Sequence, residues 1–316
     1  MFFLPYFAFD FLAKICYNFN MNYTVDKNKI VVTNTEDFCP MHILECGQVF
    51  RFKKVDENYI VYSKDKYAKI VPNFNDNGQV ISYDIITDDI PYFINYFDLD
   101  TDYSAIKTTV LNLSDNKDFM VDAVSKGKGI RILNQDEFEA TISFVISQNN
   151  NIKRIQLIIE RICKKFGSNM GEYYAFPSPK QLQTATEQDF KNLGAGYRAK
   201  FLVNVIKYFA DFDFISFKSK PVLDMEKELL SIVGIGQKVA DCIMLFGYHK
   251  MEYFPVDTWI EKVYREYFAP TEIKNSSKPL NRLKIRQFLT EKFGSNSGYA
   301  QQYLFYYERT LKNIKN

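Results

Sequence analysis

Hydrophobic periodicity changes once along this chain, and that change restricts the fold more than any other feature of the sequence. From about Tyr23 to Thr87, short β-branched and aromatic runs alternate with turn-forming residues, a pattern typical of antiparallel strands. From Asp136 onward, apolar residues recur at the spacing of amphipathic helices. Strands followed by helices predict an α+β fold with segregated parts rather than alternating βα units. The strand-like runs are KIVVT, QVFRFKKV, NYIVYS, YAKIV and VISYDII.

The helical part is expected to start at Asp136, which forms a D-x-x-E capping box with Glu139. Phe138, Ile142 and Val145 then recur at helical spacing. We therefore expect an N-terminal antiparallel sheet domain at residues 21–130 and all-helical domains at residues 131–316. Further helices are predicted at about residues 152–166, 179–191, 197–209, 224–232, 237–246, 258–267, 280–293 and 300–312.

Composition argues against several classes of site. The five cysteines are odd in number and form no CxxC, which favours reduced thiols over a disulfide framework or a zinc site. Because His42 and His249 are the only histidines, a Ser-His-Asp triad and a His-rich metal centre are poorly supported. A net charge of +2 permits a polyanionic partner without requiring one. The cysteines are Cys16, Cys39, Cys46, Cys163 and Cys242.

The first 20 residues read MFFLPYFAFDFLAKICYNFN and are strongly apolar. Pro5, Asp10 and Lys14 interrupt the run, which is too short to span a bilayer and lacks the charged start and cleavage site of a signal peptide. We interpret residues 1–20 as a non-native or disordered extension, with Met21 as the first native residue. The sequence therefore predicts no membrane partner and a cytoplasmic protein, associated with the nucleoid if its source is prokaryotic.

The stretch LLSIVGIGQKVADCIML predicts two helices joined by a tight glycine turn. Gly234 and Gly236 let the chain turn with its amides uncovered, and such amides at a helix N-terminus suit a phosphate group. Lys238 stands where the helix dipole disfavours a cation. Partial burial beside Ile235 and Val239 would favour a neutral amine, a nucleophile able to form a Schiff base. The alternative is an αα-hairpin that uses glycine only to turn.

A second candidate group follows in YFPVDTWIEKVY. Pro255 fixes an extended approach, and Asp257 then stands where the next helix would be capped. Helix capping alone is a sufficient reason for an aspartate at this position. A carboxylate at a helix N-terminus also stays ionised and can face a developing positive charge, so Asp257 can serve both purposes.

These two segments carry a resemblance. The stretch VGIGQKVADCIMLFGYHKMEYFPVDTWIEKV resembles the helix-hairpin-helix and Gly/Pro-Asp signature of base-excision DNA glycosylases, and most closely the 8-oxoguanine DNA glycosylase/lyase family. The resemblance implies that the hairpin with Gly234 and Gly236 grips a phosphate of the damaged strand. It also implies that Lys238 attacks C1′ of a flipped nucleotide while Asp257 supports the oxocarbenium-like transition state.

Two further segments resemble the parts of this family that face the opposite strand. SFVISQNNNIKRI matches an NNN-I-x-R-I segment, which implies that Asn149 fills the gap left by the extruded base and Arg154 reads the orphaned cytosine. LGAGYRAKF matches an LG-x-GYRA turn, which implies that Tyr197 wedges into the base stack and Arg198 contacts the same cytosine. Without the family, the asparagines would be helix punctuation and Tyr197 a core residue.

The base pocket is likewise implied by resemblance. ECGQVFRF resembles a strand whose glycine carbonyl accepts a hydrogen bond from N7–H of 8-oxoguanine, which corresponds to Gly47. GYAQQYLFYYERTL resembles the C-terminal helix, which implies that Gln301 pairs with the edge of the purine and Phe305 stacks on its ring. Cys242 would pack on the other face of the base. Taken alone, Phe305 and Cys242 would more often be ordinary core residues.

One departure from the family concerns Thr258 and Trp259, which stand where relatives place a phosphate-contacting histidine shortly after the catalytic aspartate. The phosphate contact therefore has no predicted residue in this chain. Helix packing is the simplest role for Trp259.

The sequence thus predicts a bifunctional DNA glycosylase/β-lyase that excises 8-oxoguanine in base excision repair. Its expected partner is double-stranded DNA containing oxidised guanine, bound by a monomer. No metal or organic cofactor is expected, although a monovalent ion can sit in the hairpin. One alternative is a non-catalytic helix-hairpin-helix DNA-binding protein, in which Lys238 is one more positive charge. The other is a glycosylase for an alkylated purine, which would need neither Gly47 nor a lysine nucleophile.

Overall fold

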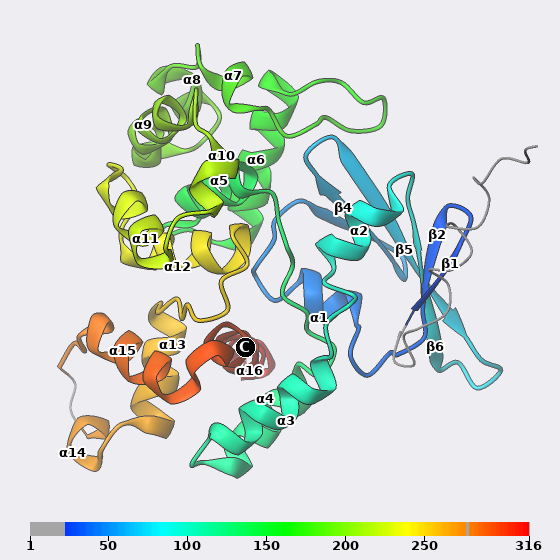
Figure 1. Ribbon diagram of the computed structural model, residues 1–316, viewed down its shortest axis with the longest axis vertical. Coiled ribbons are helices and arrows are strands. Elements are labelled where there is room, and N and C mark those ends of the chain that lie inside the picture. Colours follow the sequence, from blue (N-terminus) through cyan, green and yellow to red (C-terminus); the bar gives the residue numbers. More distant parts are fainter. Residues whose placement is uncertain (1–22, 276–277, 316) are drawn as a thin grey trace, which may run out of the picture.

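An antiparallel sheet and a larger set of helices lie side by side in the computed structural model, which describes residues 23–275 and 278–315 (Figure 1). The α+β class, with strands first and helices afterwards, is confirmed. The interpretation of residues 1–20 lies outside the described residues. The strands follow the order β1-β2-β6-β5-β4-β3 across the sheet. They are β1 Tyr23–Asp26, β2 Lys29–Val32, β3 Phe52–Val55, β4 Asn58–Ser63, β5 Lys66–Phe74 and β6 Val80–Ile86.

Alternating burial explains why these short runs form strands. In β4, Tyr59, Val61 and Ser63 are buried while the residues between them are half-buried, so one face of the strand lies on a core. The predicted run QVFRFKKV forms a strand only from Phe52 onward. The preceding Arg51 is buried and bonded to the helical part of the molecule, which draws this stretch away from the sheet edge.

Helices that the sequence did not predict lie before Asp136. They fill the stretches between and after the strands, and several begin at a side chain that caps the first turn, such as Asp89, Asp102 and Asn116. Of these, α4 packs against the C-terminal helix. They are α1 Pro40–Leu44, α2 Ile90–Tyr96, α3 Tyr103–Leu113 and α4 Lys117–Lys126.

The helices predicted after Asp136 are present, with some divided. The predicted helix at residues 179–191 is two helices, because Thr186 caps a new one and accepts a hydrogen bond from the Asp189 amide. The helices near residues 242 and 263 each widen into a π-type turn, Ile243–Gly247 and Tyr264–Phe268. The remaining bounds are α5 Glu137–Ser147, α6 Ile152–Phe166, α7 Pro179–Leu182, α8 Glu187–Asn192, α9 Ala199–Phe209, α10 Phe214–Lys218, α11 Val222–Ser231, α12 Gln237–Cys242, α13 Thr258–Val263, α14 Thr271–Lys274, α15 Arg282–Phe293 and α16 Ser297–Lys315.

The expected capping box at the start of α5 is only half correct. Asp136 accepts a hydrogen bond from the Glu139 amide, as predicted. The Glu139 carboxylate, however, is buried and accepts from Arg51 at 3.2 Å and from the Lys64 amide at 2.8 Å instead of returning to the cap. The Glu139 carboxylate therefore pairs with buried Arg51, from the sheet side of the molecule, instead of capping the start of α5.

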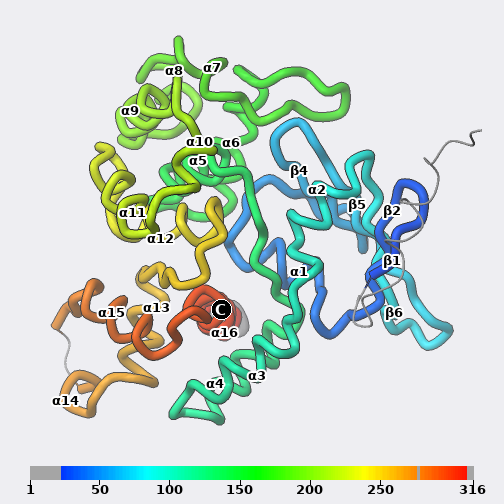
Figure 2. Tube along the Cα trace, in the orientation of Figure 1, coloured from blue at the N-terminus to red at the C-terminus, as the bar shows by residue number. Residues whose placement is uncertain are grey.

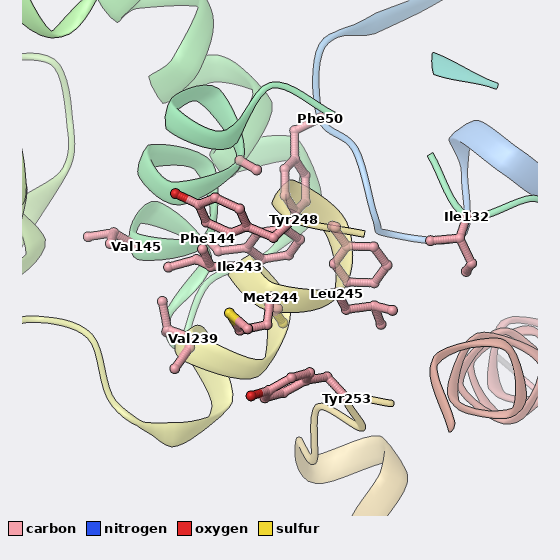
Figure 3. Close-up of a cluster of buried hydrophobic side chains, with 14 of the residues drawn as sticks. Phe50, Ile132, Phe144, Val145, Val239, Ile243, Met244, Leu245, Tyr248 and Tyr253 are labelled. Carbon is pink, nitrogen blue, oxygen red and sulfur yellow. The ribbon is translucent and has the colours of Figure 1, made fainter. Parts of the chain in front are cut away.

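The helical core surrounds α5, in which every residue from Phe138 to Ile146 is buried. Phe144 stacks on Phe246 with ring centroids 5.3 Å apart. It also meets Phe50 edge-on, with ring centroids 5.8 Å apart (Figure 3). A separate apolar cluster lies under the sheet. Across the described ranges, we find no helix long and apolar enough to cross a membrane.

The C-terminal helix α16 packs beside α1 and the residue that follows it, Glu45. Figure 2 shows α16 nearly end-on, close to α1. Two contacts confirm this proximity: His42 packs its ring 5.4 Å from that of Tyr306, and Arg309 donates to the Glu45 carbonyl at 2.9 Å. The segment around Gly47 and α16 are thus in contact, although they are far apart in sequence.

Candidate active site

The glycine turn between α11 and α12 is built by close packing on one side and open space on the other. Gly234 has φ +111°, and a Cβ there would lie 2.6 Å from the Cβ of Phe201 on α9, so only glycine fits. Gly236 has φ −93°, and no atom lies within 4 Å of the position that its Cβ would take. The second glycine therefore leaves the start of α12 uncovered, as a backbone seat for a phosphate requires.

Lys238 lies in the first turn of α12, partly buried, with its ammonium nitrogen 5.5 Å from the centroid of the Phe144 ring. One turn later, burial raises the pKa of the Cys242 thiol to about 11, while the positive charge of the nearby Lys238 opposes that shift. Within the described ranges, no ion pair joins Lys238 to a carboxylate. The Lys238 amine thus lies near the Phe144 ring and the Cys242 thiol and forms no salt bridge with the described residues.

Asp257 caps α13 as predicted, since one carboxylate oxygen accepts from the amides of Trp259 at 2.9 Å and Ile260 at 3.0 Å. The negative charge of Asp257 raises the pKa of the Cys242 thiol slightly, whereas Lys238 lowers it, so both groups are close enough to act on this thiol. The structure therefore brings together the two groups that the sequence singled out for chemistry.

The residues expected to hold the base come from three elements. Gly47 has φ +90°, and a Cβ there would lie 3.2 Å from Cε1 of Phe305, so the glycine backbone and the ring are in contact. Gln301 is buried on the same helix as Phe305 and donates to the Pro255 carbonyl at 3.4 Å. Gly47 and Phe305 are therefore in contact, and Gln301, one turn earlier on the helix of Phe305, reaches the segment that leads into Asp257.

A cavity of about 410 Å³ lies elsewhere, between β3 and α6. Phe50 lines it and packs edge-on against Phe144, whose ring carries Lys238 on its face. The catalytic candidates do not line this cavity, so we assign the site from the converging side chains and not from the cavity.

The residues expected to face the opposite strand gather around the NNN turn. Asn149 adopts φ +47°, a left-handed conformation that asparagine tolerates better than most residues. Arg154 is exposed and donates to the Gly194 carbonyl at 3.1 Å. Tyr197 is 52% exposed and its hydroxyl donates to the Gln148 carbonyl at 3.2 Å. Asn149, Arg154 and Tyr197 thus form one accessible surface.

Arg198 differs from its three neighbours. It is buried, and its guanidinium donates to the carbonyls of Gln148 at 2.7 Å and Asn149 at 2.6 Å. In this structure Arg198 supports the NNN turn, whereas the resemblance implied a direct contact with cytosine. Gln148 in turn donates to the Gly234 carbonyl at 3.0 Å, which ties the NNN turn to the glycine hairpin.

Sequence reasoning missed the polar cluster behind α12. The Asp241 carboxylate is buried and pairs with Arg286 at 3.0 Å, and Arg286 also pairs with Glu226 at 3.0 Å. Gln237 bridges Glu226 at 2.7 Å and Asp241 at 3.0 Å. Burial raises the pKa of Asp241 to about 6, an effect that Arg286 opposes. The sequence signal for this cluster was Asp241 itself, an acidic residue within the apolar run VADCIML.

Arg309 was also missed, although it lies beside Gly47. A Cβ on Gly47 would lie 3.0 Å from its Nη1 atom. No periodic or local pattern marks this residue, because its partners lie at the other end of the sequence. Throughout the described part of the chain, no group of three or more His, Cys, Asp or Glu side chains is placed to hold a metal ion.

Comparison with known proteins adds to this geometry. Two family models match consecutive parts of the chain: 8-oxoguanine DNA glycosylase, N-terminal domain, at residues 30–141, and HhH-GPD superfamily base excision DNA repair protein, at residues 142–286. The N-glycosylase/DNA lyase of Saccharomyces cerevisiae is 30% identical, over 86% of this chain and 84% of its own length. The chain belongs to the 8-oxoguanine DNA glycosylase/lyase family.

Solved structures agree with this family assignment. The 8-oxoguanine glycosylase/lyase of Clostridium acetobutylicum, in complex with double-stranded DNA containing cytosine opposite 8-oxoG, is 36% identical with a TM-score of 0.80. That match covers 92% of this chain and 100% of the other. The apo form of the same enzyme is 38% identical with a TM-score of 0.77, over 90% of this chain and 98% of the other. A 3-methyladenine DNA-glycosylase from Archaeoglobus fulgidus, at 14% identity and a TM-score of 0.65, shares the fold alone.

Proposed function

We propose that this glycosylase/lyase excises 8-oxoguanine from duplex DNA in base excision repair, with Lys238 as the nucleophile. The observation that carries the proposal is the position of Lys238 on Phe144 and beside the neutral thiol of Cys242. The free amine of a lysine is a nucleophile that can form a Schiff base with a sugar carbon. Asp257, whose carboxylate accepts hydrogen bonds from two backbone amides, is the counter-charge.

The proposed reaction uses these groups in the following order. The damaged nucleotide rotates out of the duplex, and its base enters between Gly47, Gln301, Phe305 and Cys242. The Lys238 amine then bonds to C1′ as the bond from C1′ to the base breaks, and the electron pair of that bond leaves with the base. Asp257 stabilises the positive charge that develops on the sugar. Loss of a proton from the Lys238 nitrogen and opening of the C1′–O4′ bond convert this adduct into a Schiff base, with O4′ released as a hydroxyl. Removal of a C2′ proton then permits β-elimination of the 3′ phosphate, which cleaves the strand.

The surrounding turns position the DNA. The open amides at Gly236 are the proposed seat for a phosphate of the damaged strand. Exposed Arg154 is the proposed reader of the opposite cytosine, and Tyr197 the aromatic wedge. Asn149 fills the space left by the lesion. Arg198 acts through the backbone carbonyls of the NNN turn that it binds.

The remaining features of the proposal concern partners and environment. The protein acts as a monomer on double-stranded DNA containing oxidised guanine, in the cytoplasm or on the nucleoid. The chemistry needs neither a metal nor an organic cofactor, because the nucleophile, counter-charge and leaving group are all organic. A monovalent ion is proposed to sit in the glycine hairpin.

Substitution of Lys238 tests the proposal. We expect Lys238→Gln to abolish cleavage of 8-oxoguanine-containing duplex and covalent trapping by borohydride, while binding to the same duplex persists. Lys238→Arg keeps a positive charge but cannot form the Schiff base, so it should be as inactive as Lys238→Gln. A Lys238→Arg variant that excises the base at the wild-type rate would show that the lysine contributes charge alone.

A further inference from the structure

Arg309 is half-buried, and one nitrogen of its guanidinium lies shielded and unpaired beside Gly47 and Phe305, two residues of the proposed base site. One nitrogen of Arg309 donates to the Glu45 carbonyl at 2.9 Å. The other, Nη1, is shielded from solvent and finds no hydrogen-bond acceptor within the described ranges. No carboxylate there lies within ion-pair distance of Arg309 either. Leaving a buried donor unpaired costs free energy, so such a group calls for a reason.

The position of this donor supplies the reason. Nη1 lies 3.0 Å from the place that a Cβ of Gly47 would take, and the Phe305 ring lies 3.2 Å from the same place. The guanidinium carbon is 5.9 Å from the centroid of that ring. The unpaired N–H is therefore beside the backbone that is proposed to read the lesion and the ring that is proposed to stack on it.

We propose that Arg309 donates a hydrogen bond from Nη1 to the C8 oxygen of the flipped 8-oxoguanine. This inference rests on the proposed function, in which the Gly47 carbonyl accepts from N7–H. The N7–H donor and the C8 oxygen acceptor are on adjacent atoms of the lesion, as in an amide. A carbonyl and an N–H side by side in the protein match that pair. Normal guanine lacks both groups, and its entry would leave Arg309 unpaired.

The same contact assists the departure of the base. When the bond between C1′ and N9 breaks, its electron pair passes to the base, and the negative charge is shared between N9 and the C8 oxygen. Arg309 keeps its proton throughout and stabilises this charge through the hydrogen bond. Arg309 thus contributes to breaking the bond to the base and has no part in the later elimination of the phosphate.

Separate measurement of the two steps tests the contact. We expect Arg309→Leu to slow single-turnover excision of 8-oxoguanine by about 100-fold, as loss of one donor to a developing anion does in other enzymes. Cleavage of a preformed abasic site, which has no base to expel, should keep the wild-type rate. Arg309→Lys can retain the charge and one donor but not the second, and should recover less than about a tenth of the lost rate. Arg282→Leu, on an exposed ion pair with Glu261, is the control and should leave both rates unchanged.

Three outcomes would overturn the inference. Equal slowing of excision and abasic-site cleavage in Arg309→Leu would mean that Arg309 only supports the fold near Gly47. Excision by that variant at the wild-type rate would mean that no contact with the base forms. Full recovery in Arg309→Lys would mean that charge alone suffices. Failure of the proposed function is distinguishable, because wild-type enzyme would then fail to cleave the abasic site or to be trapped by borohydride.

Discussion

Lys238 and Asp257 are fixed by their places on two helices rather than by a bond to each other. The lysine lies in the first turn of α12 against Phe144, and the aspartate is held by the first amides of α13. Each helix thereby carries one of the two proposed catalytic groups, and both groups act electrostatically on the same thiol, Cys242. Within the described ranges, no carboxylate forms an ion pair with Lys238.

Opposite-base preference should depend on Arg154. We expect Arg154→Ala to reduce the preference for cytosine opposite 8-oxoguanine by about tenfold, the usual worth of one good contact to a base edge. Single-turnover excision from duplexes with each of the four bases opposite the lesion measures this. Arg161 is the matched control, since it is on the same helix and also donates to a backbone carbonyl near Gly194. If Arg154→Ala and Arg161→Ala give the same profile as wild type, Arg154 does not read the opposite base.

Asp241 should make the stability of the protein depend on pH. Burial raises its pKa to about 6 in the folded state from 3.8, so the folded protein binds this proton more tightly than the unfolded chain does. The resulting stability is fully present below pH 3.8 and is lost as the pH rises through about 6. We therefore expect wild type to gain stability relative to Asp241→Asn as the pH falls from 7 to 4. Urea unfolding at several pH values measures the free energies of unfolding of both proteins. A difference between wild type and Asp241→Asn that stays constant from pH 7 to 4 would contradict the raised pKa of Asp241.

Single residues differ in how well the sequence predicted them. Lys238 and Asp257 could be found because each breaks or satisfies a local rule of helix ends. The buried role of Arg198 could not, because a guanidinium that binds backbone carbonyls across the fold has the same sequence signature as one that binds DNA. Arg309 could not be predicted for the same reason, since the carbonyl that it binds, that of Glu45, lies more than 250 residues away along the chain.

At the scale of elements, the two glycines of the hairpin have separable tasks. We expect Gly234→Ala to lower the free energy of unfolding by about 2 kcal/mol, because it combines a positive φ with a clash against Phe201. Gly236→Ala meets no atom and has an ordinary φ, so its stability should equal that of wild type. Thermal melting of both variants measures the difference. Equal melting temperatures would contradict the packing argument.

Long, strongly periodic elements were predicted well, and short capped ones were not. The helix Ile152–Phe166 has the bounds that its pattern indicated, because its apolar face repeats over several turns. By contrast, α1 and α2 are short, and both have a proline at their first turn in a region otherwise rich in strands. Their stability comes from packing under the sheet, which local sequence does not report.

At the scale of the whole molecule, the ion pair between Arg51 and Glu139 joins the sheet side to the central helix α5. Both side chains are buried, and burial raises the pKa of Glu139 while Arg51 opposes that shift. We expect Glu139→Gln to cost about 3–5 kcal/mol, since it leaves a buried guanidinium without its counter-charge. Denaturant unfolding measures the loss. Glu187→Gln, in an exposed pair with Lys191, should cost less than about 1 kcal/mol. Similar losses in the two variants would mean that the buried pair does not hold the two parts together.

The hydrogen bonds that link the NNN turn, the GYRA turn and the glycine hairpin fix these three loops, which we propose contact DNA, to one another. Arg198 clamps one turn, and Gln148 passes the connection on to Gly234. We therefore expect these loops to keep their arrangement on binding, so that the DNA must deform to fit the protein. Lesions in stretches that already bend or unpair easily should accordingly be removed sooner than the same lesion embedded in stiff sequence.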